Sequence, residues 1–207
     1  MYDLPYYREH DEHVIMEFIE RYPFAFLSGC DSTNRPVATQ APVFVERQDD
    51  RIVLSGHIMK GTDHHEAFSI NEHVLAVFNG PHTYVSATWY SNPEVASTWN
   101  YMSVHARGVI RFLGHDGLEA VLRKTSLHFE NHDEHSPTVF DNLPAEFRNK
   151  VMHMIVGFEI EVSELKAVFK LSQERGAETH RSIVEKLEDG DENARLIAAE
   201  MKKRPPQ

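Results

Sequence analysis

Aromatic and hydrogen-bonding side chains are interleaved in residues 80–105, which hold both tryptophans of the chain, Trp89 and Trp99. Aromatic faces can stack on a flat ring system, while hydroxyl, amide and imidazole groups can hydrogen-bond to its polar edge. The segment therefore favours a binding site for a flat, partly polar ring. The alternative is a pair of strands whose aromatic side chains pack in the core.

A second group of residues could bind an anion. His57, Lys60 and Thr62 lie where a predicted strand meets the start of a predicted helix. Backbone N–H groups and the positive end of a helix dipole favour a phosphate at such a junction. The alternative is a solvated loop in which Thr62 only caps the helix.

Several motifs occur in an order typical of one family. Gly-Pro-His-Thr-Tyr-Val-Ser spans residues 80–86, Trp-Tyr follows at 89–90, and Thr-Trp-Asn-Tyr-Met-Ser-Val-His spans 98–105. Shorter matches occur at residues 35–39, 56–57 and 169–173. With these motifs the chain resembles the PaiB family of FMN-binding split-barrel proteins over residues 1–175. The family usually has Asn after Ser-Gln, whereas this chain has Glu174, so the role of a neutral amide does not carry over.

The resemblance implies a mainly β (α+β) fold, an FMN-binding split β-barrel of antiparallel strands with peripheral helices and a helical C-terminal tail. It implies FMN as the cofactor and a homodimer with cofactor sites at the interface, which residues 99–105 reach from the partner subunit. Strand alternation would turn Thr39 and Ala41 to one side and Gln40 to the other. The residues that we expect to bind the cofactor are Thr39, Gln40, Ala41, Pro42, His57, Lys60, Thr62, Trp99, Asn100, His105, Lys170, Ser172 and Gln173.

Three functions remain open for such a barrel. The first is a flavin-dependent oxidoreductase, for example an NAD(P)H-dependent reductase, in which the flavin carries the electrons. The second is a flavin-binding transcriptional regulator without turnover, as the family's regulatory name implies. The third is a haem-binding or haem-degrading barrel, with His128 and His132 as candidate ligands. We expect no metal site, because the acidic, His-rich segment 128–135 is typical of a solvated surface.

Composition narrows the classes of partner. The net charge is −11, with 32 acidic against 21 basic residues, which disfavours direct binding to DNA. The basic cluster at residues 202–204 is typical of a frayed, solubilising end.

Cysteine content and hydropathy bear on disulfides and on location. Cys30 is the only cysteine, so no intrachain disulfide can form. The sequence shows no apolar run long enough to cross a membrane and no apolar signal core, which predicts a cytoplasmic protein.

Hydrophobic periodicity predicts the elements that must position these residues. Predicted helices cover residues 14–22, 64–70, 116–129, 144–152, 179–187 and 193–201, and predicted strands cover 24–29, 36–46, 51–57, 74–78, 84–87, 101–113 and 155–169. The polar clusters at residues 31–34 and 48–50 predict hairpin turns between strands. The strands form an antiparallel meander able to close a small barrel. We expect a split-barrel domain at residues 1–175 and a charged helical extension at 176–207.

Overall fold

The computed structural model describes residues 2, 4–92 and 95–206. In these residues seven strands form one sheet in the order β1-β7-β4-β3-β2-β5-β6, with β7 also paired to β6. The strands are β1 (Arg8–Glu9), β2 (Phe24–Cys30), β3 (Pro36–Gln48), β4 (Arg51–Met59), β5 (His73–Val85), β6 (Thr98–Phe112) and β7 (Ile155–Lys170). The α-helices are α1 (Glu12–Arg21), α2 (Asp63–Ile70), α3 (His115–Phe129), α4 (Ala145–Met154), α5 (Ala177–Glu188) and α6 (Glu192–Lys203), and short 3-10 helices are η1 (Pro5–Tyr7), η2 (Ala87–Trp89) and η3 (Phe140–Asn142).

The chain divides into two compact units. Unit 1 consists of residues 1–18, 78–105 and 166–207, and unit 2 consists of residues 19–77 and 106–165. The predicted boundary at residue 175, between a barrel domain and a helical extension, stays a prediction.

Unit 2 is built on antiparallel hairpins. β3 pairs with β2 on one side, where Ala41 lies opposite Ala25, and with β4 on the other, where Val45 lies opposite Leu54. β4 in turn pairs with β7. In the β2–β3 turn the Asp31 carboxylate accepts hydrogen bonds from the backbone N–H groups of Thr33 and Arg35, which is the turn chemistry that the sequence predicts.

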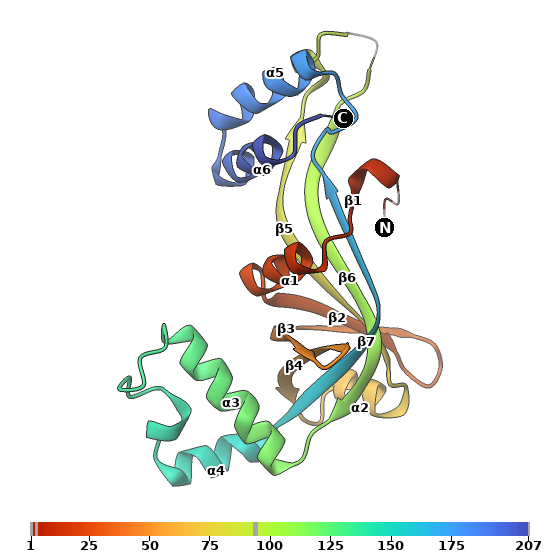
Figure 1. The fold of residues 1–207 in the computed structure, drawn as a ribbon. Coiled ribbons are helices and arrows are strands. Elements are labelled where there is room, and N and C mark those ends of the chain that lie inside the picture. Colours follow the sequence, from red (N-terminus) through yellow and green to blue (C-terminus); the bar gives the residue numbers. More distant parts are fainter. Residues whose placement is uncertain (1, 3, 93–94, 207) are drawn as a thin grey trace. The chain divides into compact units, whose positions relative to one another are not determined.

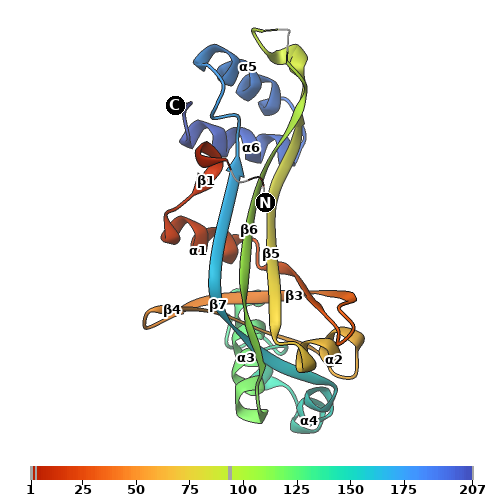
Figure 2. The same ribbon diagram turned by 90° about the vertical axis from the view of Figure 1, so that its right-hand side faces the viewer.

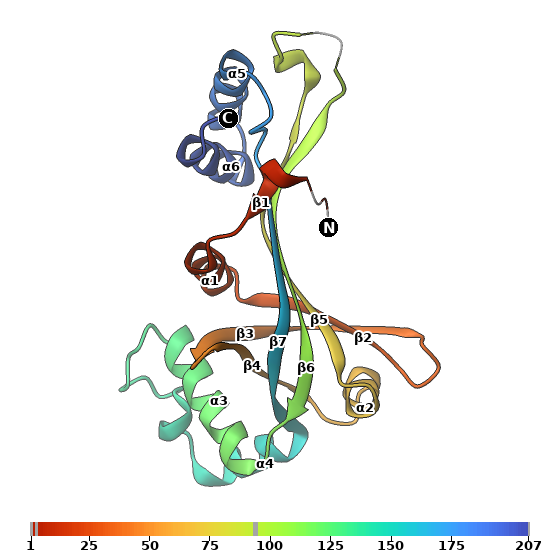
Figure 3. The same ribbon diagram turned by 45° about the vertical axis from the view of Figure 1, so that its right-hand side comes forward.

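Helices cover the sheet of unit 2 where glycine permits close approach. The Phe68 ring of α2 lies 2.9 Å from the place where a Cβ on Gly29 would stand. α3 runs beside β4 (Figure 3), and Gly157 leaves room for Leu118 at the start of α3. Gly108 on β6 comes so close to β7 that a Cβ there would lie 2.3 Å from the carbonyl oxygen of Glu161, so only glycine fits at this position.

Unit 1 contains parts of three long strands, most of α1, and the helices α5 and α6. β6 lies between β5 and β7 (Figure 2). α5 and α6 lie side by side (Figure 1) and bury apolar side chains such as Ile183, Leu187, Ile197 and Met201. Their amphipathic patterns explain this packing, since charged residues occupy the opposite faces.

The structure confirms most of the predicted elements and corrects two points. The predicted strands 74–78 and 84–87 are not separate, because the single strand β5 runs through Pro81 and ends at Val85, and Ala87 already begins η2. β2 pairs only with residues 75–77 of β5, so Pro81 lies beyond that pairing and its missing N–H is tolerated. The two-residue strand β1 was not predicted. Among the described residues no helix has the length and apolar character needed to span a membrane.

Candidate functional site

The residues predicted to bind the cofactor fall into two groups, one in each unit. Unit 2 holds Thr39, Gln40, Ala41, Pro42, His57, Lys60 and Thr62, and unit 1 holds Trp99, Asn100, His105, Lys170, Ser172 and Gln173.

In unit 2, the segment 39–42 lies in β3, the strand between β2 and β4. Ala41 is buried and Thr39 half-buried, whereas Gln40 is exposed, so the predicted alternation is confirmed. A Cβ on Gly56 would stand 2.8 Å from the carbonyl oxygen of Pro42, which places this end of the segment against β4. The amide of Gln40 is therefore the accessible polar group of the segment.

His57 on β4 carries a buried polar atom without a partner. Its Nδ1 is shielded from solvent and makes no hydrogen bond to any described residue. Burial lowers the pKa of His57, which keeps the ring neutral near pH 7. An unpaired buried nitrogen of this kind is costly unless another molecule supplies its hydrogen bond. Among the predicted site residues of unit 2, His57 would therefore gain most from a hydrogen bond to a bound ligand.

Thr62 caps helix α2, as the alternative interpretation of this segment held. Its hydroxyl donates to the carbonyl oxygen of Met59 at 3.1 Å and accepts from the backbone N–H of His65, while the Asp63 carboxylate accepts from the N–H of His64. The first N–H groups of α2 are thus bonded to its own side chains. The exposed ammonium of Lys60, in contrast, has no hydrogen-bond or ion-pair partner among the described residues.

Lys170 of unit 1 is buried, with 6% of its surface exposed. Its ammonium donates to Thr98 Oγ1 and to the carbonyl oxygen of Trp99, both at 2.7 Å, and lies 5.6 Å from the centre of the Tyr7 ring. Burial lowers the pKa of Lys170, and the nearby Glu174 carboxylate partly opposes that shift. The ammonium of Lys170, which we expected to bind the cofactor, is therefore bonded to groups within the protein.

Asn100, Ser172 and Gln173 complete a polar network beside Lys170. Ser172, whose backbone is left-handed (φ 60°), donates from its hydroxyl to Asn100 Oδ1 at 3.0 Å. Gln173 Nε2 donates to the carbonyl oxygen of Phe169, and its Oε1 accepts from the N–H of Leu171. These side chains are buried and bonded to one another or to backbone, which supports a structural role. The sixth residue of this group, His105, is half-buried on β6.

The side chain of Trp99 points away from this network. It is 53% exposed and packs edge-on against Tyr84, which is 49% exposed, with ring centres 6.1 Å apart. His82 lies at a similar distance on the same patch. The His82–Tyr84–Trp99 patch is thus an exposed aromatic surface of unit 1.

Sequence reasoning missed two contributors, Tyr7 and Arg175, and left the role of Glu174 open. Glu174 accepts a hydrogen bond from the Tyr7 hydroxyl and pairs with Arg175 at 2.9 Å. Burial, followed by the Glu174 charge, raises the pKa of Tyr7. Arg175 also stacks over Tyr90, 4.9 Å from the ring centre. In the sequence, only the departure from the family pattern at Glu174 pointed to this cluster, because Tyr7 lies far from Glu174 along the chain.

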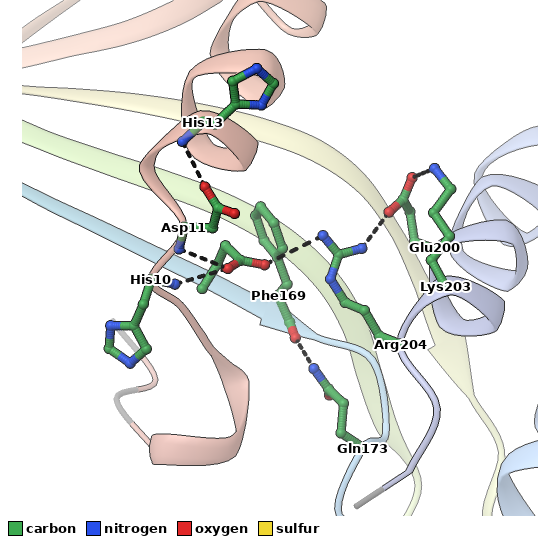
Figure 4. A network of polar contacts seen from close by, with 9 residues as sticks. His10, Asp11, His13, Phe169, Gln173, Glu200, Lys203 and Arg204 are labelled. Carbon is green, nitrogen blue, oxygen red and sulfur yellow. Dashed lines mark hydrogen bonds and ion pairs between the residues drawn. The ribbon is translucent and has the colours of Figure 1, made fainter.

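The basic residues 202–204 are not a frayed end, contrary to the prediction. Arg204 donates to Glu200 at 2.6 Å, lies 3.5 Å from Glu9 and stacks over Phe169 (Figure 4). Lys203 also bonds to Glu200, and Lys202 pairs with Glu188. The acidic residues that face this end of α6 provide the ordered partners that local composition could not reveal.

The histidine-rich segment forms no compact metal cluster among the residues that the structure covers, where no group of three or more His, Cys, Asp or Glu side chains could hold an ion. The rings of His128 and His132 lie 6.1 Å apart, and His128 packs edge-on against Phe44. His128 and His132 therefore take part in ring packing at the protein surface.

Comparisons with known proteins were made at the level of family, sequence and fold. A family model described as "Putative FMN-binding domain" matches residues 1–164. The chain is 31% identical to the protease synthase and sporulation protein PAI 2 of Bacillus subtilis, over 96% of this chain and 95% of that protein. An uncharacterised protein of Emericella nidulans is 25% identical over 81% of this chain and 79% of its own length.

Solved structures with the same fold include a flavocytochrome from Azotobacter vinelandii, with a TM-score of 0.56, 16% identity, and 79% of this chain and 69% of that chain covered. A FAD- and haem-binding protein from Mycobacterium smegmatis gives a TM-score of 0.55 at 16% identity, covering 79% and 73%. A conserved hypothetical protein from Mycobacterium tuberculosis gives 0.57 at 12% identity, covering 88% and 92%. These likenesses confirm the predicted fold, a mainly β split barrel with peripheral helices.

Proposed function

Because this chain belongs to the FMN-binding domain family whose model matches residues 1–164, we propose that it is an FMN-dependent oxidoreductase that works as a homodimer. The family assignment confirms FMN as the predicted cofactor. The electron donor, the oligomeric state and the residue roles below are parts of the proposal.

The observation that carries the proposal is the unpaired, buried Nδ1 of His57. The polar edge of a flavin ring offers hydrogen-bond donors and acceptors that such an atom lacks within the protein. Unit 2 also offers the exposed amide of Gln40 and the unpartnered ammonium of Lys60, one for the ring edge and one for the phosphate. The side chains present in unit 2 therefore fit FMN.

In this proposal, β3 and β4 bind and orient the flavin. Bound FMN supplies transfer of a hydride or of single electrons, and an NAD(P)H-dependent reductase is the reaction class that we favour. The neutral imidazole of His57 would hydrogen-bond to the ring, and the buried segment at Ala41 would exclude water from one side. No nucleophile paired with a base is needed, since the electron chemistry belongs to the flavin.

The homodimer rests on the His82–Tyr84–Trp99 patch. Two aromatic side chains, each about half exposed and in contact with one another, expose an apolar surface that a partner would cover. A second copy of the chain is the most frequent partner of a soluble domain. Trp99, Asn100 and His105 would then lie near the cofactor site of the other subunit, as the family resemblance implies.

A titration with FMN tests the proposal. Wild-type protein should quench FMN fluorescence with a micromolar Kd, and His57→Ala should weaken binding by about 1 kcal/mol, the usual contribution of a neutral hydrogen bond. His13→Ala, which removes an exposed imidazole in unit 1, is the matched control and should leave the Kd unchanged. Failure of the wild-type protein to bind FMN would refute the proposal.

Simple measurements distinguish two other functions from that of an oxidoreductase. The PAI 2 relative and the family's regulatory name favour a regulator, in which bound flavin would not be reduced by NADH or NADPH. The flavocytochrome and the FAD- and haem-binding neighbours favour haem as an additional ligand. Haem binding would appear as a Soret band on titration with haemin, and loss of the band in His128→Ala would assign the ligand.

A further inference from the structure

A cavity of about 250 Å³ opens at the start of α3 in unit 2. It lies among the beginning of α3, the end of α4 and the first residues of β7, and Lys60, the residue that follows β4, also lines it. The residues predicted for the cofactor site contribute only Lys60 to it. Its remaining polar side chains come from segments to which the family motifs assign no role.

The polar side chains of this cavity are basic or neutral donors, and most are available. The side chains of Lys60, Asn149 and His153 line it and form no hydrogen bond or ion pair in the described part of the chain, although the backbone N–H of Lys60 donates to the carbonyl oxygen of Met154. His115 also lines it and lies 3.5 Å from the exposed carboxylate of Asp116, the acidic group next to it. A lysine, two imidazoles and an amide in one hollow form a donor set suited to an oxyanion.

The floor of the cavity is apolar. Leu118 and Met152 belong to a buried cluster with Phe140, and Ile155 packs against that cluster. A ligand in this cavity would therefore contact hydrocarbon below and donors at the rim. Such a lining suits an anionic group that is attached to a small carbon body rather than a free, fully hydrated ion.

The first turns of α2 and α3 differ in whether their backbone N–H groups have side-chain acceptors, and the difference favours an anion site at α3. The first N–H groups of α2 are bonded to Thr62 and Asp63, as described above. Helix α3 begins after Gly114, which provides no side-chain cap. The open N–H groups of α3 add to the attraction that Lys60 and the imidazoles already provide.

We propose that the cavity lined by Lys60, His115, Asn149 and His153 binds the phosphate of a phosphate monoester, with the carbon body of the ligand on the floor formed by Leu118, Met152 and Ile155. Two sources could supply this group, the phosphate of FMN itself or a separate phosphorylated metabolite. Only the first source rests on the proposed function.

Calorimetric titration with phenyl phosphate tests the site, with phenol as the uncharged comparison. Wild-type protein should bind phenyl phosphate and discriminate against phenol. Lys60→Met should weaken binding at least about tenfold, the effect of losing one charge-assisted hydrogen bond. Lys150→Met, which removes an exposed lysine of α4 that does not line the cavity, is the matched control. His153→Gln should also weaken binding, and circular dichroism would confirm that each variant is folded.

No binding of phenyl phosphate to the wild-type protein at millimolar concentration, or equal affinities in Lys60→Met and Lys150→Met, would overturn the proposal. Flavin titrations then identify the source. Competition between phenyl phosphate and FMN, with a smaller preference for FMN over riboflavin in Lys60→Met, assigns the cavity to the FMN phosphate. Undiminished binding of phenyl phosphate to FMN-loaded protein assigns it to a separate ligand. A protein that binds phenyl phosphate but no flavin would refute the proposed function and leave the phosphate site standing.

Discussion

The ammonium of Lys170 donates a 2.7 Å hydrogen bond to the backbone carbonyl oxygen of Trp99, so a buried charge on β7 fixes the strand that carries an exposed tryptophan. The same ammonium bonds to Thr98 Oγ1. Lys170 thus connects two of the family motifs, residues 98–105 and 169–173, by hydrogen bonds within the protein. Its role in the structure therefore comes before any role in binding.

Replacing Lys170 should therefore destabilise the protein more than it weakens flavin binding. Lys170→Met keeps the aliphatic stem but leaves the Trp99 carbonyl and Thr98 hydroxyl without their donor, and we expect the free energy of unfolding to fall by about 1–3 kcal/mol. Urea denaturation measures the loss, with the exposed Lys150→Met as control. A large drop in FMN affinity with unchanged stability would instead assign Lys170 to the phosphate.

Arg204 should contribute more to stability than its neighbour Lys202. Arg204 joins Glu200 and Glu9 and covers the Phe169 ring, whereas Lys202 and Glu188 form a pair that is about half exposed. Arg204→Ala should lower the free energy of unfolding by about 1–3 kcal/mol, and Lys202→Ala by less than about 1 kcal/mol. Thermal unfolding of the two variants gives the comparison, and equal losses would contradict it.

Mild acid should destabilise unit 1 through His180. This side chain is buried and its Nε2 has no partner among the described residues, and burial lowers its pKa from 6.5. Between the folded-state pKa and 6.5 the unfolded chain binds more protons, so stability falls as the pH falls through this interval.

The slope should be at most about 1.4 kcal/mol per pH unit for this group. Urea denaturation from about pH 7 to about pH 5 should show a weaker pH dependence in His180→Gln than in the wild type. His57, whose pKa is lowered for the same reason, should give a similar but separate effect in His57→Gln. Identical pH profiles for wild type and His180→Gln would contradict the prediction, because they would show that His180 binds protons equally in the folded and unfolded states.

Trp99→Ala should weaken the homodimer and FMN binding together. Exposed aromatic residues at the centre of an interface commonly contribute about 2 kcal/mol or more. Sedimentation equilibrium of wild type, Trp99→Ala and Phe147→Ala measures the dimer, and Phe147, an exposed aromatic of α4, serves as the control. A monomeric wild-type protein, or a variant that loses flavin while staying dimeric, would show that the patch is not the interface.

Local pattern was sufficient to predict most elements of this fold. The spacing of Val14, Ile15, Phe18 and Ile19 defined α1, and the polar clusters at 31–34 and 48–50 located two hairpin turns. β5 was predicted as two strands on either side of Pro81. Whether a proline interrupts a strand depends on which neighbour needs its N–H, and sequence alone does not give the neighbour.

The candidate site was less predictable, for a related reason. Residue type singled out His57, Lys60 and Lys170 alike. It could not show that the Nδ1 of His57 lacks a partner among the described residues, or that Lys170 is buried and already bonded to Trp99. His115 and His153 carried no recognisable spacing, since they meet across a cavity and not along one helix. Partners that lie far apart in the chain decide whether a polar side chain is free to bind.

The division of the chain sets the order in which the two units become complete during synthesis. Every residue of unit 2 has been made once the ribosome passes residue 165, whereas unit 1 still lacks its third stretch, residues 166–207. Glu9 must wait for Arg204, which is 195 positions later in the chain. The first segment of unit 1 therefore meets its later partners only after all of unit 2 has been synthesised, so unit 2 can begin to fold before unit 1 is complete.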